Sequence, residues 1–297
     1  MKKYLSILFA AATAVALIAS CEKNGDNGGT TLDADDPGTV KTSNLVAYFP
    51  LESETNAVVA DGITYSKKAG AAGFVKGMRG NAYSNTAADC TNISYLEFDV
   101  ASDNPFKTMS SFTISCWMKM PIPNSGSPAM LSLNGGDPGM GNILVMFEGW
   151  GCNSDSLFVK PYLYNSVSRE WKGHDLGKSA SAYKTDKWFH LVYSYNENDS
   201  KMSVYADGTL VVDNGRWKDP QDAEGNQDPL GKIVLGEGIS NFYVGAWFNN
   251  LNGDHADAWR TSYSGLVDEI RIWNVALTPE EIEDLYTKEV VKADGIE

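Results

Sequence analysis

The sequence predicts an all-β fold, a two-sheet antiparallel sandwich with one short C-terminal helix. From Leu45 onward, short apolar or alternating runs are separated by Gly, Asn, Asp and Pro, which is typical of antiparallel sandwiches and barrels. Residues 201–206 and 209–212 are separated only by Asp207-Gly208, a pair that suits a type I′ hairpin turn. One segment, from Thr278 to about Lys288, has the pattern of a helix.

Strands are expected where apolar residues alternate or fill a short run. Residues 188–195 are apolar on both faces, which favours a central strand. Residues 112–118 alternate, and we expect one face to line the core: Phe112, Ile114, Cys116 and Met118. Further strands are expected at 45–51, 95–98, 143–147, 157–164, 242–245 and 266–273.

The helix has strong start signals. Thr278 is the expected N-cap, and Pro279 occupies the first helical position, where its missing N–H costs nothing. Glu281 can reach back to Thr278 as a capping box requires, and Leu277 can pack against Ile282 as a hydrophobic staple.

The N-terminus has the pattern of a targeting segment. Lys2 and Lys3 precede an apolar run over 5–18, which is too short to span a bilayer as a mature helix. Ile18-Ala19-Ser20-Cys21 resembles the lipobox of bacterial lipoproteins, which implies that residues 1–20 are a signal peptide and that Cys21 carries lipid. An ordinary signal peptide with a chance cysteine, or an uncleaved anchor, is the alternative.

A polar stretch follows Cys21. Residues 21–43 contain no aromatic residue and only Leu32 and Val40 as large apolar ones, so they are expected to form a disordered tether. This acidic, Gly-rich stretch resembles the surface-export signal of glycan-foraging Gram-negative bacteria, which implies a lipid-anchored protein on the outside of the outer membrane. The expected divisions are the sandwich domain at 44–289 and a tail at 290–297.

Charge and cysteine usage narrow the function. The net charge of −14 should repel nucleic acid and anionic polysaccharide, and it leaves neutral glycans or divalent cations as better candidates. Cys90, Cys116 and Cys152 permit at most one internal disulfide in the mature chain. None lies in a metal-binding spacing, so the sequence gives no support for zinc or thiol catalysis.

A family resemblance appears near the C-terminus. Residues 265–282 combine Gly265, Asp268-Glu269, an alternating strand, Ala276-Leu277 and a capped helix. With the pieces at 45–49, 112–117 and 188–192 in the same order, this resembles laminin-G-like jelly rolls of the concanavalin A-like lectin/glucanase superfamily. The resemblance implies two packed antiparallel sheets, one of them curved, with ligands on the concave face or at the loop rim. That fold hosts lectins, enzymes and adhesion domains, so it implies no single function.

No catalytic residue is predicted. Retaining glycosidases need two carboxylates about 5 Å apart, and the closely spaced carboxylate pattern of laminarinase-like members is absent. Asp268 and Glu269 are adjacent, so on a regular strand they should point to opposite faces. Among the histidines, His174, His190 and His255, we interpret His190 as a structural side chain within its strand, with its hydrogen bonds satisfied.

Tryptophans in polar surroundings indicate carbohydrate binding, because a pyranose stacks on an aromatic ring while polar side chains bind its hydroxyls. Trp117, Trp188 and Trp273 lie in strand patterns and are expected in the core. The first candidate site is the segment 247–263, with Trp150 and Trp171 as a second. The alternative for the segment 247–263 is that Trp247 and Trp259 only pin a long loop to the sandwich. The predicted ligand-binding residues are Trp247, Asn249, Asn250, Asp254, His255, Asp257, Trp259, Arg260, Tyr263, Trp150 and Trp171.

The resemblance also raises a structural calcium ion. Many laminin-G-like domains hold Ca²⁺ through an Asp after the first strand and the Asp of the closing signature, which here implies Asp61 and Asp268. Residues 61–64, Asp-Gly-Ile-Thr, depart from the family's pattern, and an Asp that caps a turn is the alternative at Asp61.

The leading hypothesis is therefore a surface lipoprotein that binds poly- or oligosaccharide without cleaving it, alongside other glycan-uptake proteins. The second is an adhesion or protein-interaction module, since Trp, Tyr and Arg also anchor protein interfaces. The third is a glycoside hydrolase or lyase with an atypical site.

Overall fold

The computed structural model describes residues 40–85, 93–123, 126–134, 141–165, 170–172, 178–216, 231–233, 235, 238–251, 258–291 and 293. For 165, 170–172, 178 and 213–216 it describes the backbone alone. All of these residues belong to the second of two compact units, Leu32–Glu297. Among the described residues, no helix has the length and apolar character needed to cross a membrane.

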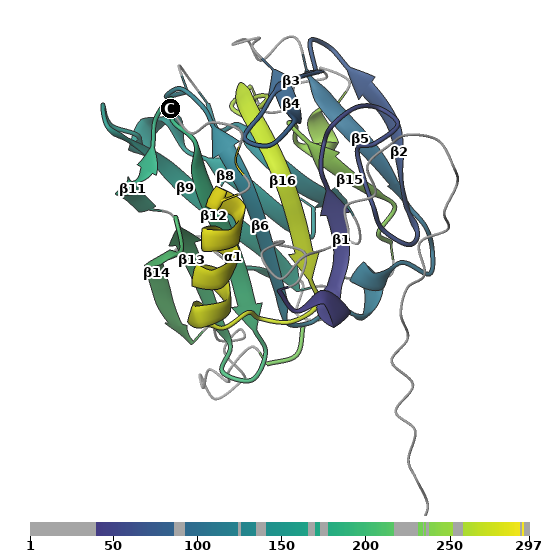
Figure 1. Ribbon diagram of the computed structural model, residues 1–297, viewed down its shortest axis with the longest axis vertical. Helices are drawn as coiled ribbons and strands as arrows, with labels where there is room; N and C mark the ends of the chain where they lie inside the picture. The colour runs from purple at the N-terminus through teal and green to yellow at the C-terminus, as the bar shows by residue number, and fades with distance from the viewer. Residues whose placement is uncertain are drawn as a thin grey trace, which may run out of the picture. The chain divides into compact units, whose positions relative to one another are not determined.

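The first sheet is antiparallel and eight-stranded in the described part of the chain (Figure 1). Its order is β14-β13-β12-β6-β16-β4-β3, and β1 also pairs with β16. The strands are β1 (Leu45–Phe49), β3 (Gly73–Lys76), β4 (Asn81–Asn85), β6 (Phe112–Lys119), β12 (Phe189–Asn196), β13 (Lys201–Ala206), β14 (Thr209–Arg216) and β16 (Gly265–Trp273).

The second sheet is also antiparallel and eight-stranded over the described residues. Its order is β10-β9-β8-β7-β15-β5-β2, with β11 paired to β9. The strands are β2 (Ile63–Ala69), β5 (Tyr95–Val100), β7 (Ala129–Asn134), β8 (Ile143–Phe147), β9 (Ser156–Asn165), β10 (Glu170–Lys172), β11 (Lys178–Lys184) and β15 (Asn241–Val244). Short 3-10 turns are η2 (Thr42–Asn44), η3 (Pro105–Thr108), η4 (Gly149–Gly151) and η6 (Phe248–Asn250).

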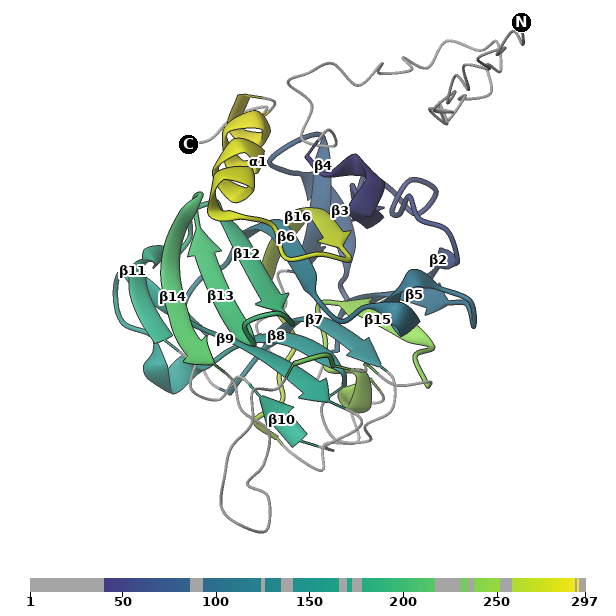
Figure 2. The ribbon, with the colours of Figure 1, turned by 90° about the horizontal axis from the view of Figure 1, so that it is seen from below.

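The main core lies between the two sheets, and the helix α1 (Pro279–Val291) covers the outer side of the first sheet (Figure 2). Ile282 and Leu285 of α1 pack with Val192 of β12 and Trp273 of β16. Both faces of β12 are therefore covered, which confirms the expected central strand. The predicted core face of 112–118 is confirmed as well: Phe112, Ile114, Cys116 and Met118 all lie in the main core.

The local signals for the hairpin and the helix cap are confirmed. Asp207 and Gly208 have positive φ angles of 48° and 74°, as a type I′ turn requires. The Thr278 N–H donates to Glu281 Oε2 at 2.9 Å, and the Glu281 N–H donates to Thr278 Oγ1 at 3.3 Å, which is the reciprocal capping box. These strands and the helix establish the two-sheet sandwich that the sequence predicted.

One inference about β16 was wrong. Glu269 has a positive φ of 53°, and the pairing of β16 with β6 shifts register between Asp268 and Arg271. Val267 and Ile270, three residues apart, both enter the main core. The bulge thus breaks the alternation that would have separated Asp268 from Glu269, and both carboxylates are buried.

Candidate functional site

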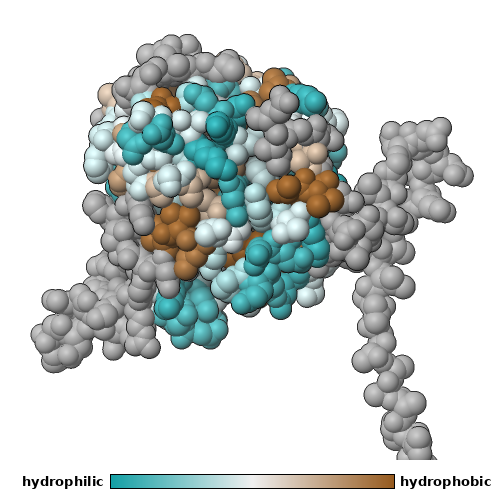
Figure 3. Space-filling model, turned by 60° about the vertical axis from the view of Figure 1, so that its left-hand side comes forward, coloured by the Kyte–Doolittle hydropathy of each residue, from teal (hydrophilic) through white to brown (hydrophobic). Residues whose placement is uncertain are grey.

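Few large apolar side chains are exposed, and two of them are tryptophans. On the face in Figure 3, apolar patches are separated by hydrophilic side chains. Trp150 is 76% exposed and Trp259 is 42% exposed, and no other aromatic side chain of the described residues is classed as exposed. These two rings therefore mark the candidate site.

Trp150 is held in a fixed position although it is exposed. It lies in η4, directly after β8. Its Nε1 donates to Glu148 Oε2 at 2.8 Å, and its ring packs against Phe158 of β9 with centroids 5.2 Å apart. An exposed ring that is already ordered loses little conformational entropy when a ligand stacks on it.

Glu148 beneath Trp150 forms a nearly buried ion pair. Its Oε1 lies 2.7 Å from Lys160 Nζ, and the Ser127 hydroxyl donates to its Oε2 at 2.7 Å. Burial acts to raise the pKa of Glu148, but the hydrogen bonds from Lys160, Ser127 and Trp150 outweigh burial and hold this pKa below its ordinary value. The pKa of Lys160 is raised: burial acts to lower it, and the bond to Glu148 overcomes that effect. The pair is therefore charged at neutral pH.

Trp259 is linked to Glu148 and Trp150 by hydrogen bonds of Ser127. The Ser127 N–H donates to the carbonyl of Trp259 at 2.7 Å, and the Ser127 carbonyl accepts from Trp247 Nε1 at 2.8 Å. The rings of Trp247 and Trp259 meet edge to face at 5.3 Å. The Arg260 guanidinium lies 5.3 Å from the Trp247 ring centroid and 5.0 Å from that of Trp259. We call Ser127, Glu148, Trp150, Trp259 and Arg260 the tryptophan rim.

Glycines allow this close approach. Gly126 has a φ of +71°, and a Cβ there would lie 2.6 Å from the Trp259 carbonyl oxygen. The Gly149 N–H donates to the Gly126 carbonyl at 3.1 Å. This bond connects η4 to the residues before β7 that contact Trp259. Backbone bonds thus join the two halves of the rim.

Several predicted ligand-binding residues support the rim instead of facing solvent. Trp247, Asn250 and Tyr263 are buried. Asn250 Nδ2 donates to the Arg260 carbonyl at 2.5 Å, and the Tyr263 hydroxyl donates to the Leu266 carbonyl at 3.0 Å. The loop-pinning role considered for Trp247 is the one that the structure favours, because both its ring and its Nε1 are used inside the protein.

The remaining predicted ligand residues divide into two groups. Asn249 is half-buried in η6. Asp254, His255 and Asp257 lie outside the described residues, as does the side chain of Trp171, whose backbone forms part of β10.

The two predicted calcium ligands differ in environment. Asp61 is exposed in the turn before β2. Asp268 is buried, and its carboxylate accepts from the backbone N–H of Arg79 at 3.0 Å and of Glu269 at 2.9 Å. Within the described residues, no three His, Cys, Asp or Glu side chains gather as a metal site would require. The calcium site stays a prediction.

Sequence reasoning missed Glu148, Lys160 and Ser127. Lys160 stands in the middle of an otherwise apolar strand, and Glu148 follows directly after another. A buried charge needs a partner. Opposite charges within one apolar strand and directly after another could therefore have predicted the Glu148–Lys160 ion pair.

The arrangement resembles known proteins in sequence and in fold. A family model described as the concanavalin A-like lectin/glucanases superfamily matches residues 93–242. Adhesion G-protein coupled receptor D1 from Homo sapiens is 29% identical over 105 residues, which are 35% of this chain. The chain spans about a tenth of the length of that curated relative, since the match covers 10% of it.

Two solved structures show the same fold. The botulinum neurotoxin serotype D binding domain superposes with a TM-score of 0.52 at 12% identity, covering 82% of this chain and 51% of that one. The serotype D ligand-binding domain in complex with N-acetylneuraminic acid gives a TM-score of 0.52 at 12% identity, over 84% and 52% of the two chains. The match covers about half of each toxin domain, and at this identity the likeness concerns the fold alone.

Proposed function

We propose, from the premise that this chain belongs to the concanavalin A-like lectin/glucanase superfamily, that it binds carbohydrate at the tryptophan rim without cleaving it. One observation carries the proposal. The two exposed tryptophans of the described residues, Trp150 and Trp259, are linked through Ser127, whose hydroxyl donates to Glu148 beneath Trp150 and whose N–H donates to the Trp259 carbonyl.

The chemistry of the rim suits a sugar. The apolar C–H face of a pyranose can stack on the ring of Trp150, which its bond to Glu148 holds in place, while the Arg260 guanidinium beside Trp259 offers charged hydrogen-bond donors. The serotype D toxin domain, which shares this fold over about half of its length, was solved with N-acetylneuraminic acid. A sugar-binding protein can therefore contain this fold, which supports the proposal.

The charge state of Glu148 supports binding over glycoside hydrolysis. A general acid must hold a proton, so its pKa must be raised. The pKa of Glu148 is lowered instead, and both of its oxygens accept hydrogen bonds. Asp268 and Glu269 are buried. We therefore infer a binding protein with no catalytic carboxylate at the rim.

The position of the rim also fits a surface lipoprotein anchored at Cys21, which we retain as part of the proposal. Val40, the first described residue, accepts a hydrogen bond from Trp273 at the end of β16. Trp259 and Arg260 lie just before the start of β16. A strand rises about 3.3 Å per residue, so the rim lies roughly a strand's length from the end where the N-terminal segment joins.

The test is retention of soluble polysaccharides by the full-length chain. Affinity electrophoresis and a glycan array, each with calcium and then with EDTA, should show retention without new reducing ends. Trp150→Ala should weaken retention about tenfold, as expected when a central aromatic anchor is removed. The matched control is Leu210→Ala, because Leu210 is 46% exposed on β14 and lies outside the rim.

Three outcomes would contradict this proposal. New reducing ends would make the protein an enzyme. No retention of any glycan would favour a protein partner. Equal retention by the Trp150→Ala and native chains would place the binding elsewhere on the molecule.

A further inference from the structure

We propose a second, separate binding site for an uncharged, hydroxyl-rich molecule the size of a mono- or disaccharide, in a polar pocket at the opposite end of the sandwich. The pocket has a volume of about 490 Å³, within the roughly 300–1,000 Å³ of typical small-molecule sites. It lies where β6 begins, β12 ends and β16 ends, whereas the tryptophan rim lies near the opposite ends of β6 and β16.

The lining is almost entirely polar. It consists of Lys41, Asn44, Thr108, Ser110, Ser111, Asn196, Glu197, Asn198, Lys232, Asn274, Val275, Ala276, Thr278 and Glu281. Of these described residues none is aromatic, so the pocket offers no ring for stacking. It offers amides and hydroxyls, which both donate and accept hydrogen bonds, as the hydroxyl groups of a sugar do.

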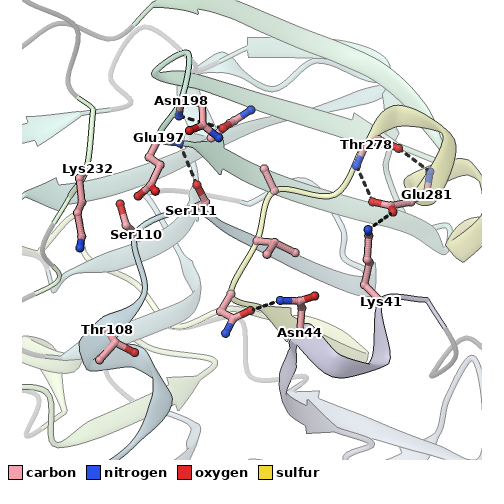
Figure 4. A pocket seen from close by; sticks show the side chains of 14 residues that line it. Lys41, Asn44, Thr108, Ser110, Ser111, Glu197, Asn198, Lys232, Thr278 and Glu281 are labelled. Carbon is pink, nitrogen blue, oxygen red and sulfur yellow. Dashed lines mark hydrogen bonds and ion pairs between the residues drawn. The ribbon is translucent and has the colours of Figure 1, made fainter. Parts of the chain in front are cut away.

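The charges of the lining cancel. Two lysines and two glutamates line the pocket, and Lys41 Nζ pairs with Glu281 Oε1 at 3.0 Å. In Figure 4, Glu197, Ser110 and Lys232 lie on one side of the pocket, and Lys41, Asn44 and Glu281 lie on the other. This balance favours an uncharged ligand over an anion or a cation.

One buried atom lacks a partner. Glu197 Oε2 is shielded from solvent and has no hydrogen-bond partner among the described residues. A desolvated carboxylate oxygen without a donor is costly. A ligand hydroxyl in the pocket can supply that donor if the Glu197 side chain turns toward the pocket, since Oε2 is shielded from solvent as it stands.

Two side-chain amides of the lining are already oriented. Asn274 Oδ1 accepts from Asn44 Nδ2 at 2.9 Å, and Asn196 Oδ1 accepts from the Asn198 N–H at 3.0 Å. Each bond uses the amide oxygen and so restrains the plane of the Asn274 or Asn196 amide. The site is thus built from polar groups that are held in place before a ligand arrives.

Saturation-transfer NMR with the full-length chain tests this site. The probes are free glucose, galactose, mannose, arabinose, xylose, maltose and cellobiose. We expect at least one of them to bind, Glu197→Ala to weaken that binding by at least about tenfold, and Trp150→Ala to leave it unchanged. Asn274→Ala, at an exposed position, is a second pocket variant and should weaken the same sugar.

The results separate this pocket from the rim. Loss of small-sugar binding in the Trp150→Ala chain, with binding kept in both pocket variants, would overturn the proposal. Failure of every sugar in the panel to bind the native chain would overturn it as well. Polysaccharide retention at the rim can fail while small-sugar binding in the pocket persists, so the two proposals fail independently. Thermal unfolding of each variant verifies that it is folded.

Discussion

His190 is a buried residue whose two ring nitrogens have no hydrogen-bond partner among the described residues. Its ring lies 5.4 Å from Trp117, in a tilted arrangement, and stacks on Tyr286 at 6.0 Å, while Trp117 and Tyr286 lie 5.9 Å from each other. The pKa of His190 is lowered to about 3, first by burial and then by the charge of Arg271. The neutral ring therefore acts as an aromatic packing element. The structural role expected from the sequence is right, but the expected hydrogen bonds of its nitrogens are not found among the described residues.

His190 should make the fold sensitive to acid. Above pH 6.5 the ring is neutral in both states and contributes no pH dependence. Below that pH, His190 takes up a proton in the unfolded chain but stays neutral in the folded chain down to about pH 3. The free energy of unfolding therefore decreases as the pH is lowered. From pH 7.5 to 5.0 the loss from this residue is about 2 kcal/mol. Urea unfolding should show a loss smaller by that amount in His190→Phe, and an equal loss in both chains would contradict the argument.

The tryptophans show how far residue-level prediction reached. Trp117, Trp188 and Trp273 were expected to be buried from their strand patterns, and all three are. Trp150 and Trp259 were predicted from their polar surroundings, and both are exposed. Trp247 is followed by Asn249 and Asn250 in sequence, yet it is buried, and its indole reaches Ser127, 120 residues away. A contact at that separation leaves no local signal.

At the scale of elements, α1 is held to the first sheet by a buried charge cluster. Arg271 of β16 pairs with Glu289 of α1, and its guanidinium lies 2.7 Å from Glu269. Tyr48 of β1 donates to Glu269 at 2.7 Å. Burial raises the pKa of Glu289 to about 7, although the charge of Arg271 acts to lower it. The helix is therefore joined to β16 by charge as well as by apolar packing.

Glu289→Ala tests this junction. It leaves Arg271 buried with a single carboxylate partner, and breaking a buried pair costs about 3 kcal/mol or more. The matched control is Glu283→Ala, an exposed position on the same helix that should change stability by less than about 0.5 kcal/mol. Both are measured by urea unfolding at pH 8, where Glu289 is ionised in the native chain. Equal effects of the two substitutions would show that the cluster contributes nothing.

Several strands that the sequence did not predict lie at sheet edges. β3 ends the first sheet, and β2, β10 and β11 lie at the edges of the second. β2 and β11 carry mostly polar or small residues, those of Ile63–Ala69 and Lys178–Lys184. Exposed edge strands need no apolar alternation, since pairing to a neighbour orders them. Alternation or apolar runs revealed most central strands, since these bury at least one face. β7 (Ala129–Asn134) was missed although it is largely buried between β8 and β15.

At the scale of the molecule, the sandwich places its two candidate sites at opposite ends. The rim depends on contacts between Ser127, Glu148 and Trp259, which belong to three separate parts of the chain. The pocket is lined by segments from both ends of the chain, Lys41 and Glu281 among them. A family resemblance could suggest binding at a loop rim. No sequence motif predicts which residues meet in the tryptophan rim or in the pocket, because these residues come together only when the chain folds.

The start of the described chain should matter for stability as much as an internal strand does. Val40 is buried with Trp273 and Leu277, its carbonyl accepts from Trp273 Nε1 at 2.9 Å, and Lys41 pairs with Glu281. A chain that begins at Thr42 loses the burial of one valine and one hydrogen bond, about 2 kcal/mol relative to a chain that begins at Leu32. Urea unfolding of the two chains measures this difference. A third chain that begins at Val40 should match the one from Leu32, because it keeps both contacts; if it matches the chain from Thr42 instead, Val40 does not fasten the N-terminal segment to the sandwich.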